Sequence, residues 1–174
     1  MLLFLLALAA ALLPAAPAQD AAQLYAEDLA SARRHLSRGR LTKAGLLLEE
    51  LLLPPEPEDP PGERVPPAIR HRAAVLRARI HRMKGELEEA QARLEPVLEE
   101  NPDHLGALLL QGDLHFARGR YREARRTWAA AADQDPLDTE SRFKRGLASW
   151  TLGARREARE LRQQEAAPAP RGPT

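Results

Sequence analysis

Apolar residues recur at helical spacing in the middle of the chain, in two stripes separated by a short break. The break is Arg118-Gly119-Arg120, where glycine tolerates the backbone angles of a tight turn. The pattern predicts two amphipathic helices folded into a hairpin. The first stripe consists of Leu105, Leu108, Leu109 and Phe116, and the second of Ala124, Trp128 and Ala131.

The same pattern returns on both sides of this hairpin at a period of about 34 residues. Units begin at Tyr25, His71, Leu105 and Thr139, and an insert separates the first unit from the second. A single hairpin of this kind cannot bury its apolar stripe. Because stacked neighbours make a continuous core, about three or more units are needed for stability, and the chain has enough of them.

The third unit resembles the tetratricopeptide repeat. Small, large apolar and proline residues stand at the places where that family has them: Gly112, Ala124, Trp128, Ala131 and Pro136. The resemblance implies an all-α fold, a right-handed α-solenoid of helix-turn-helix repeats over residues 19–165. Repeats are expected near 25–58, 71–104 and 105–138, and a partial, capping hairpin over 139–165 that turns at Gly153 and presents a polar outer face.

Three segments are predicted to lie outside the repeats. Residues 1–18 combine a Leu/Ala run with Ala16-Pro17-Ala18 and predict a cleaved secretion signal; an uncleaved anchor or a misassigned start remains the alternative. Residues 54–67 are rich in proline and should form an extended, non-helical insert. The tail, 166–174, should be disordered.

Composition removes several classes of function. The formal net charge of +1 predicts no general attraction to nucleic acid or anionic lipid. The absence of cysteine excludes disulfides, thiolate metal sites and cysteine nucleophiles. No phosphate-binding loop, nucleophile elbow or His-Glu-x-x-His motif occurs, so we predict no enzyme, no cofactor and no metal.

Three histidines, His35, His81 and His115, occupy the same place in successive units. Equivalent places on stacked hairpins are about 10 Å apart, too far for two imidazoles to share one zinc ion at about 2 Å. We therefore predict that these histidines pack between helices, with a metal or pH-sensing role as the alternative.

The resemblance also implies a concave groove lined by the first helix of each unit. Carried over to this sequence, the groove has arginines in its N-terminal half and mainly apolar or aromatic residues in its C-terminal half. Arginine can hold a carboxylate through two parallel hydrogen bonds, and aromatic rings supply rigid contact area. The predicted partner-binding residues are Arg33, Arg72, Arg79, Arg82, Leu109, Asp113, Phe116, Phe143 and Trp150.

These features predict a non-enzymatic adaptor that binds a protein or peptide segment in the groove. With the signal, the resemblance implies export to the periplasm or beyond, and a role in assembling envelope complexes. The alternative is a homo-oligomeric structural protein whose leucine-rich first unit self-associates through Leu47 and Leu52. Chaperone-tail binding by a Lys/Asn/Arg set is not carried over, because Asn101 is the only asparagine and no groove position has lysine.

Overall fold

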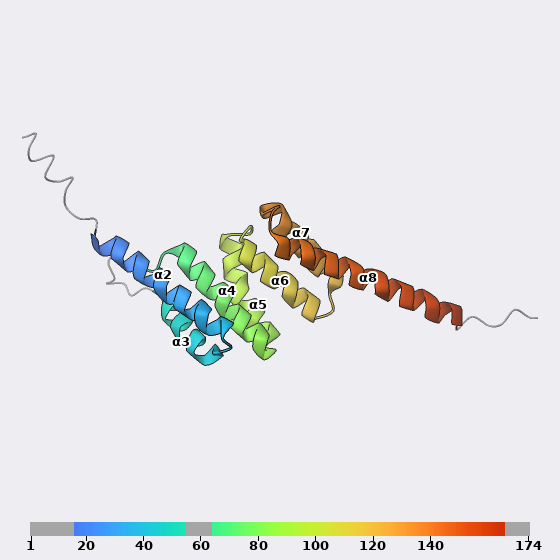
Figure 1. Cartoon of the computed structure of the whole chain (residues 1–174), viewed down its shortest axis with the longest axis horizontal. Coiled ribbons are helices and arrows are strands. Elements are labelled where there is room, and N and C mark those ends of the chain that lie inside the picture. Colours follow the sequence, from blue (N-terminus) through green and yellow to red (C-terminus); the bar gives the residue numbers. More distant parts are fainter. Residues whose placement is uncertain (1–15, 55–63, 166–174) are drawn as a thin grey trace, which may run out of the picture. The chain divides into compact units, whose positions relative to one another are not determined.

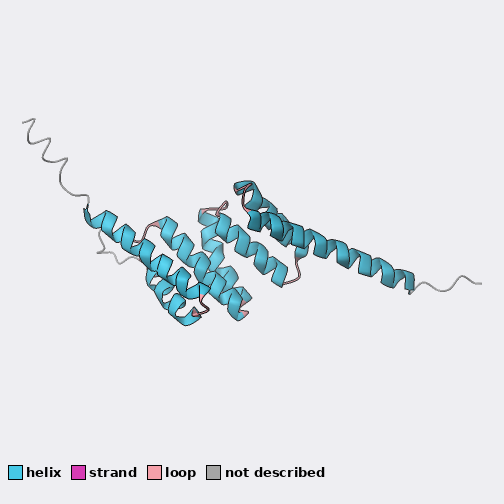
Figure 2. Cartoon of the chain, viewed as in Figure 1, coloured by secondary structure: helices cyan, strands magenta, loops and turns pink. Residues whose placement is uncertain are grey.

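The computed structural model describes residues 16–54 and 64–165 (Figure 1). Over these ranges every regular element is a helix (Figure 2). The predicted all-α fold class is confirmed. The helices are α2 (Ala16–Ser37), α3 (Leu41–Leu52), α4 (Pro67–Lys84), α5 (Leu87–Glu100), α6 (Leu105–Ala117), α7 (Tyr121–Gln134) and α8 (Thr139–Glu165). Short loops join consecutive helices, except between α3 and α4, where residues 55–63 lie outside the described part of the chain.

Most of the predicted flanking segments lie outside the described residues. Residues 1–15 hold most of the expected signal, 55–63 the centre of the proline-rich insert, and 166–174 the tail. In the described ranges, none of the helices combines the length and apolarity that crossing a bilayer requires.

The chain divides into two compact units, residues 1–84 and 85–174. The first unit contains α2 to α4, and the second contains α5 to α8. Each unit is described by itself below.

An aliphatic core holds the first unit together. α2 packs against α3 and α4, and α3 also packs against α4. Arg77 of α4 passes over Gly45 of α3, where a side chain would obstruct it, and pairs with Glu49 at 2.6 Å. The buried residues of the core are Leu29, Ala32, Leu36, Ala44, Leu48, Leu51, Ala73, Leu76 and Ile80.

Two turns with the same local sequence, Arg-Gly-Arg, end α2 and α6. Gly39 and Gly119 take φ values of 70° and 73°, a left-handed conformation that glycine adopts without steric cost. The N–H of the following arginine donates to the carbonyl of His35 at 2.9 Å in one turn and of His115 at 2.8 Å in the other. This is the Schellman arrangement, which satisfies carbonyls that the helix end leaves open.

The core of the second unit is organised around Trp128 of α7. Its indole N–H donates to the carbonyl of Leu109 in α6 at 3.1 Å, and the ring lies directly over Gly112. A Cβ atom at Gly112 would overlap the indole, so the small residue at this position is what lets the ring reach α6. Leu108, Leu109, Ala124, Ala131 and Ala148 complete the buried cluster.

The final helix, α8, differs from the predicted capping hairpin. It begins at Thr139, after Asp138 accepts the backbone N–H of Ser141 at 2.7 Å, and it continues through Gly153 without a turn. Positions 162 and 165, which should carry apolar residues in a returning helix, hold arginine and glutamate. A second helix would therefore bury no apolar stripe, whereas continuing the first keeps its backbone hydrogen bonds.

The starts of two other helices also differ from the predicted repeat boundaries. α4 begins at Pro67 rather than His71, so the last residue of the predicted non-helical insert is helical. Proline is well suited to the first position of a helix, where its missing N–H has no intrahelical role. α2 begins at Ala16, well before Tyr25, whereas α6 and α8 begin at the residues given by the repeat register.

Candidate functional site

A hollow of about 500 Å³ lies between α2 and α4 in the first unit. We call it the arginine pocket, because two of the predicted groove residues, Arg33 and Arg79, line it together with Arg34. Its remaining wall is largely apolar. The other lining residues are Leu36, Ser37, Leu76 and Met83.

The pocket concentrates positive charge beside an apolar floor. Leu36 and Leu76 belong to the core of the unit, so the floor is anchored. Within the described part of the chain, no carboxylate pairs with the guanidinium groups of Arg33, Arg34 or Arg79. The hollow can therefore accept a carboxylate next to an apolar group.

The two other predicted arginines do not line this pocket. Arg72 is exposed on α4, and Arg82 is partly buried near the end of that helix. The third arginine of the pocket is Arg34, which was not predicted. The structure thus brings together Arg33 and Arg79 and leaves Arg72 and Arg82 outside.

Three predicted residues of α6 are largely occupied inside the second unit. Leu109 is only 7% exposed and packs in the buried cluster. Asp113 accepts from Lys144 of α8 at 2.7 Å. Phe116 makes an edge contact with Tyr121, with ring centroids 4.9 Å apart, and a tilted contact with Trp128 at 5.6 Å. These three side chains shape the surface mainly through packing and pairing.

Two predicted residues of α8 are open to solvent. Phe143 is 70% exposed and Trp150 is 71% exposed. They are seven residues apart and share one side of the helix with the partly buried Leu147. We call these three residues the aromatic face.

A second hollow, of about 740 Å³, was not predicted from the sequence. It lies between α7 and α8, and we call it the arginine cleft because six arginines line it: Arg120, Arg122, Arg125, Arg155, Arg156 and Arg159. The repeat comparison missed it because the cleft depends on α8 continuing past Gly153. The sequence signals were two concentrations of arginine, one at 120, 122 and 125 and the other at 155, 156 and 159.

The leucine-rich first repeat requires a correction. Leu47 and Leu52, expected to be the self-association contacts, are partly buried against the core of the first unit. The leucines that point outward are Leu46 and Leu53, at 67% and 63% exposure. The reason is the helical spacing of α3. Leu48 and Leu51 face the core, so their sequence neighbours Leu47 and Leu52 lie at the edge of the core and are partly buried.

The equivalent histidines lie close to the ends of the first helices. His35 and His115 are partly buried, and their carbonyls close the Schellman turns. Burial, reinforced by Arg120 and Arg118 and opposed by Glu123, holds the pKa of His115 below its usual value. In the described ranges, no three histidine or carboxylate side chains gather as metal ligands would.

Comparisons with known proteins agree with this fold. Residues 81–148 match the family model of the tetratricopeptide repeat. Human Superkiller complex protein 3 is 29% identical over 79 residues, which are 45% of this chain. The chain spans only 5% of the length of that curated relative.

Three solved structures resemble the chain at low sequence identity. The first tetratricopeptide repeat domain of Spaghetti, bound to an HSP90 peptide, has a TM-score of 0.58 and 14% identity, covering 76% of this chain and 95% of its own. A tetratricopeptide-containing domain of a putative FK506-binding protein from Plasmodium falciparum gives 0.59 and 16%, covering 82% and 97%. The Sgt2 domain from Aspergillus fumigatus gives 0.58 and 14%, covering 86% and 88%.

The helix hairpins agree with the sequence match over residues 81–148, and the solved structures share this fold. Gly112, Ala124, Trp128 and Ala131 occupy the contact positions that the repeat requires, and all four are buried. Over residues 81–148 the chain resembles the tetratricopeptide repeat, and its fold is similar to that of solved tetratricopeptide-repeat domains.

Proposed function

We propose that this protein is a non-enzymatic adaptor that binds an acidic, partly apolar segment of a partner protein. The observation that carries the proposal is the arginine pocket. Three arginines without carboxylate partners among the described residues stand beside an apolar floor on the first helices of two repeats. A carboxylate would pair with Arg33 or Arg79, while a neighbouring apolar side chain would lie against Leu76 and Met83.

The aromatic face, which lies in the second unit, would supply a contact surface of its own. Phe143 and Trp150 expose large rigid surfaces, and tryptophan is among the residues that most often dominate binding energy at protein interfaces. Phe116 already packs against Tyr121 and Trp128. The aromatic side chains available to a partner are therefore those of α8.

A structural neighbour supports the class of ligand. The Spaghetti domain is bound to the peptide SRMEEVD, which contains three acidic residues and two apolar ones. This chain offers arginines in its pocket and no lysine or asparagine there. We therefore propose the same ligand chemistry without proposing the same partner.

The proposed location is outside the cytoplasm, with the adaptor assembling complexes in a bacterial envelope. The Leu/Ala run and Ala16-Pro17-Ala18 support export. N-terminal sequencing of the protein from its native cells tests this: a mature chain beginning at Gln19 agrees with cleavage, and a chain retaining Met1 in the membrane fraction indicates an anchor.

Affinity capture with two charge-matched variants tests the pocket. Arg33→Glu/Arg79→Glu should reduce retention of bound partners at least tenfold, because two like charges then face the acidic segment. Arg38→Glu/Lys43→Glu changes the charge equally on exposed residues of the same unit outside the pocket and should stay within twofold. Equal retention by the two variants at unchanged helicity would contradict pocket binding.

Self-association is a second candidate, favoured by the exposed leucines of the first unit. Leu46 is exposed on α3, and Leu53, the residue that directly follows this helix, is exposed as well. Sedimentation velocity of wild type and Leu46→Lys/Leu53→Lys tests it. A dimer that dissociates in the variant supports this function, and a wild-type monomer at tens of micromolar removes it.

A further inference from the structure

We propose that the arginine cleft of the second unit is a separate binding site for a run of acidic residues in a partner protein. The cleft lies on the second helix of one repeat, α7, and on α8, whereas the arginine pocket lies on α2 and α4. The two hollows share no residue. This site therefore stands on its own contacts.

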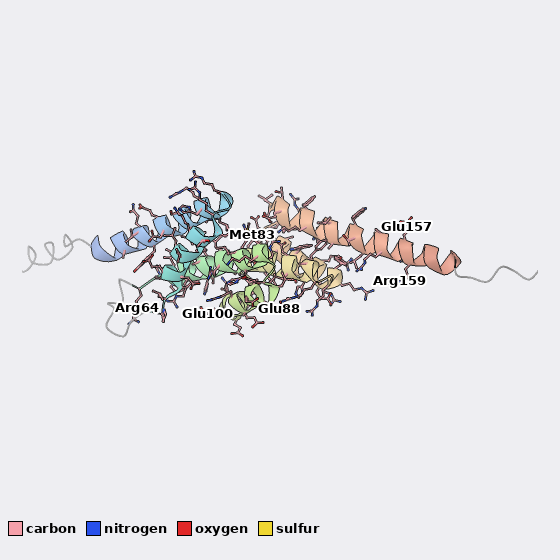
Figure 3. The ribbon with its side chains drawn as sticks, turned by 90° about the horizontal axis from the view of Figure 1, so that it is seen from below. Arg64, Met83, Glu88, Glu100, Glu157 and Arg159 are labelled. Atoms are coloured by element: carbon pink, nitrogen blue, oxygen red, sulfur yellow. The ribbon has the colours of Figure 1, made fainter. Side chains whose placement is uncertain are left out.

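Positive charge in the cleft comes from both walls. The α7 side, with the turn before it, contributes Arg120, Arg122 and Arg125, and α8 contributes Arg155, Arg156 and Arg159. Glu123 is the one acidic residue of the described lining. Glu157 projects from the opposite side of α8 to Arg159 (Figure 3) and does not line the cleft.

One wall is held in place by aromatic contacts. The guanidinium of Arg155 lies 4.9 Å from the centre of the Tyr121 ring, and Phe116 meets the same ring edge-on. A cation over an aromatic face is attracted by the ring electrons and keeps its charge. The contact links α8 to the start of α7.

The lining favours carboxylates of a peptide over nucleic acid or a membrane. Tyr121 is the single aromatic residue of the described lining, and Arg155 and Phe116 already contact its ring, so stacked bases would find no platform. Leu152 is the only aliphatic side chain of the lining and is partly buried, which leaves nothing to insert among lipid chains. All six cations are arginines, which pair with carboxylates and with phosphates in the same two-bond geometry, so the preference for a peptide rests on the missing stacking platform and the missing apolar side chains of the described lining.

Binding of a labelled peptide of eight glutamates to the full chain tests the cleft. The titrations use the Arg33→Glu/Arg79→Glu background, which removes the arginine pocket, so failure here and failure of the proposed function remain distinguishable. Arg122→Gln/Arg159→Gln should weaken binding about tenfold. The control, Arg126→Gln/Arg145→Gln, removes one exposed arginine from each of the same helices outside the cleft and should stay within twofold.

Fluorescence anisotropy at 50 mM salt gives the dissociation constants. Equal weakening by both variants would overturn the proposal, because net charge alone would then explain binding. No binding of the peptide by the background protein would also overturn it. Tighter binding of an eight-residue oligothymidine than of the peptide would also overturn the proposal, because the ligand of the cleft would then be a nucleic acid.

Discussion

The two units contain similar helix pairs whose cores consist of different kinds of side chain. The first unit has an aliphatic core in which leucine, isoleucine and alanine share the packing. The second unit places one large ring, Trp128, against Gly112 and ties it to the backbone of Leu109. The repeat pattern therefore fixes where small and large residues meet, while the distribution of volume differs from one hairpin to the next.

Their surfaces differ in a similar way. In the arginine pocket the cations stand beside Leu36, Leu76 and Met83, so charge and apolar contact can act together. In the arginine cleft the cations outnumber apolar groups, and Tyr121 is already covered. Arginine content alone therefore does not define the ligand. The side chains beside the arginines decide whether an apolar group of the ligand can bind together with its carboxylate.

Removing the Trp128 ring should change stability more than any other substitution proposed here, and it should do so mainly in the second unit. Trp128→Ala is expected to lower the free energy of unfolding by about 3–5 kcal/mol, because it deletes a fully packed ring and leaves a cavity. Trp128→Phe keeps much of the volume and should cost less. Hydrogen exchange should accelerate in α6 and α7 more than in α2 and α3; uniform acceleration would show that the two cores do not act separately.

Two glycines should respond in opposite directions. Gly119→Ala should destabilise the protein by about 1–2 kcal/mol, since alanine is strained at the φ of 73° in that turn. Gly153→Ala should instead stabilise it by about 0.5–1 kcal/mol, because residue 153 lies inside the continuous α8. Chemical denaturation measures both changes. A destabilising Gly153→Ala would indicate that α8 turns there in solution.

Salt should separate the two arginine sites. Raising salt from 50 to 300 mM should weaken octaglutamate binding to the cleft about tenfold, because exposed charges are screened. Binding of SRMEEVD to the pocket, measured in the Arg122→Gln/Arg159→Gln variant, should weaken only about threefold, since apolar contact with its floor persists. Identical salt slopes would mean that the floor contributes nothing.

Acid should produce the smallest effect, confined to the second unit. Burial and the neighbouring arginines lower the pKa of His115 in the folded protein, so the unfolded chain binds its proton more readily. This contribution to stability is present above the usual histidine pKa of about 6.5 and is lost as the pH falls through that value toward the lowered one. His115→Gln should flatten the decline in unfolding free energy between pH 7 and 5. An unchanged slope would assign the decline to other groups.

Much of the fold was predictable because the repeat places apolar and small residues by local rules. Helical spacing identified the stripes around Trp128, and the turn at Arg118-Gly119-Arg120 followed from glycine's conformational freedom. The continuous α8 was not predicted, since the register placed Gly153 where other repeats turn. Whether a glycine ends a helix depends on the apolar surface that the next segment can bury, and here that segment is polar.

The candidate sites also combine features that the sequence predicted with features that depend on tertiary packing. The sequence by itself determined the all-α repeat architecture and the presence of Arg33 and Arg79 on one face of successive first helices, because both depend on periodicity. Only the tertiary structure decided that Arg34 joins them, that Phe116 is packed while Phe143 and Trp150 are exposed, and that α7 and α8 form an arginine cleft. These outcomes depend on which neighbouring helix covers each side chain, and that is fixed by packing between segments distant in the sequence.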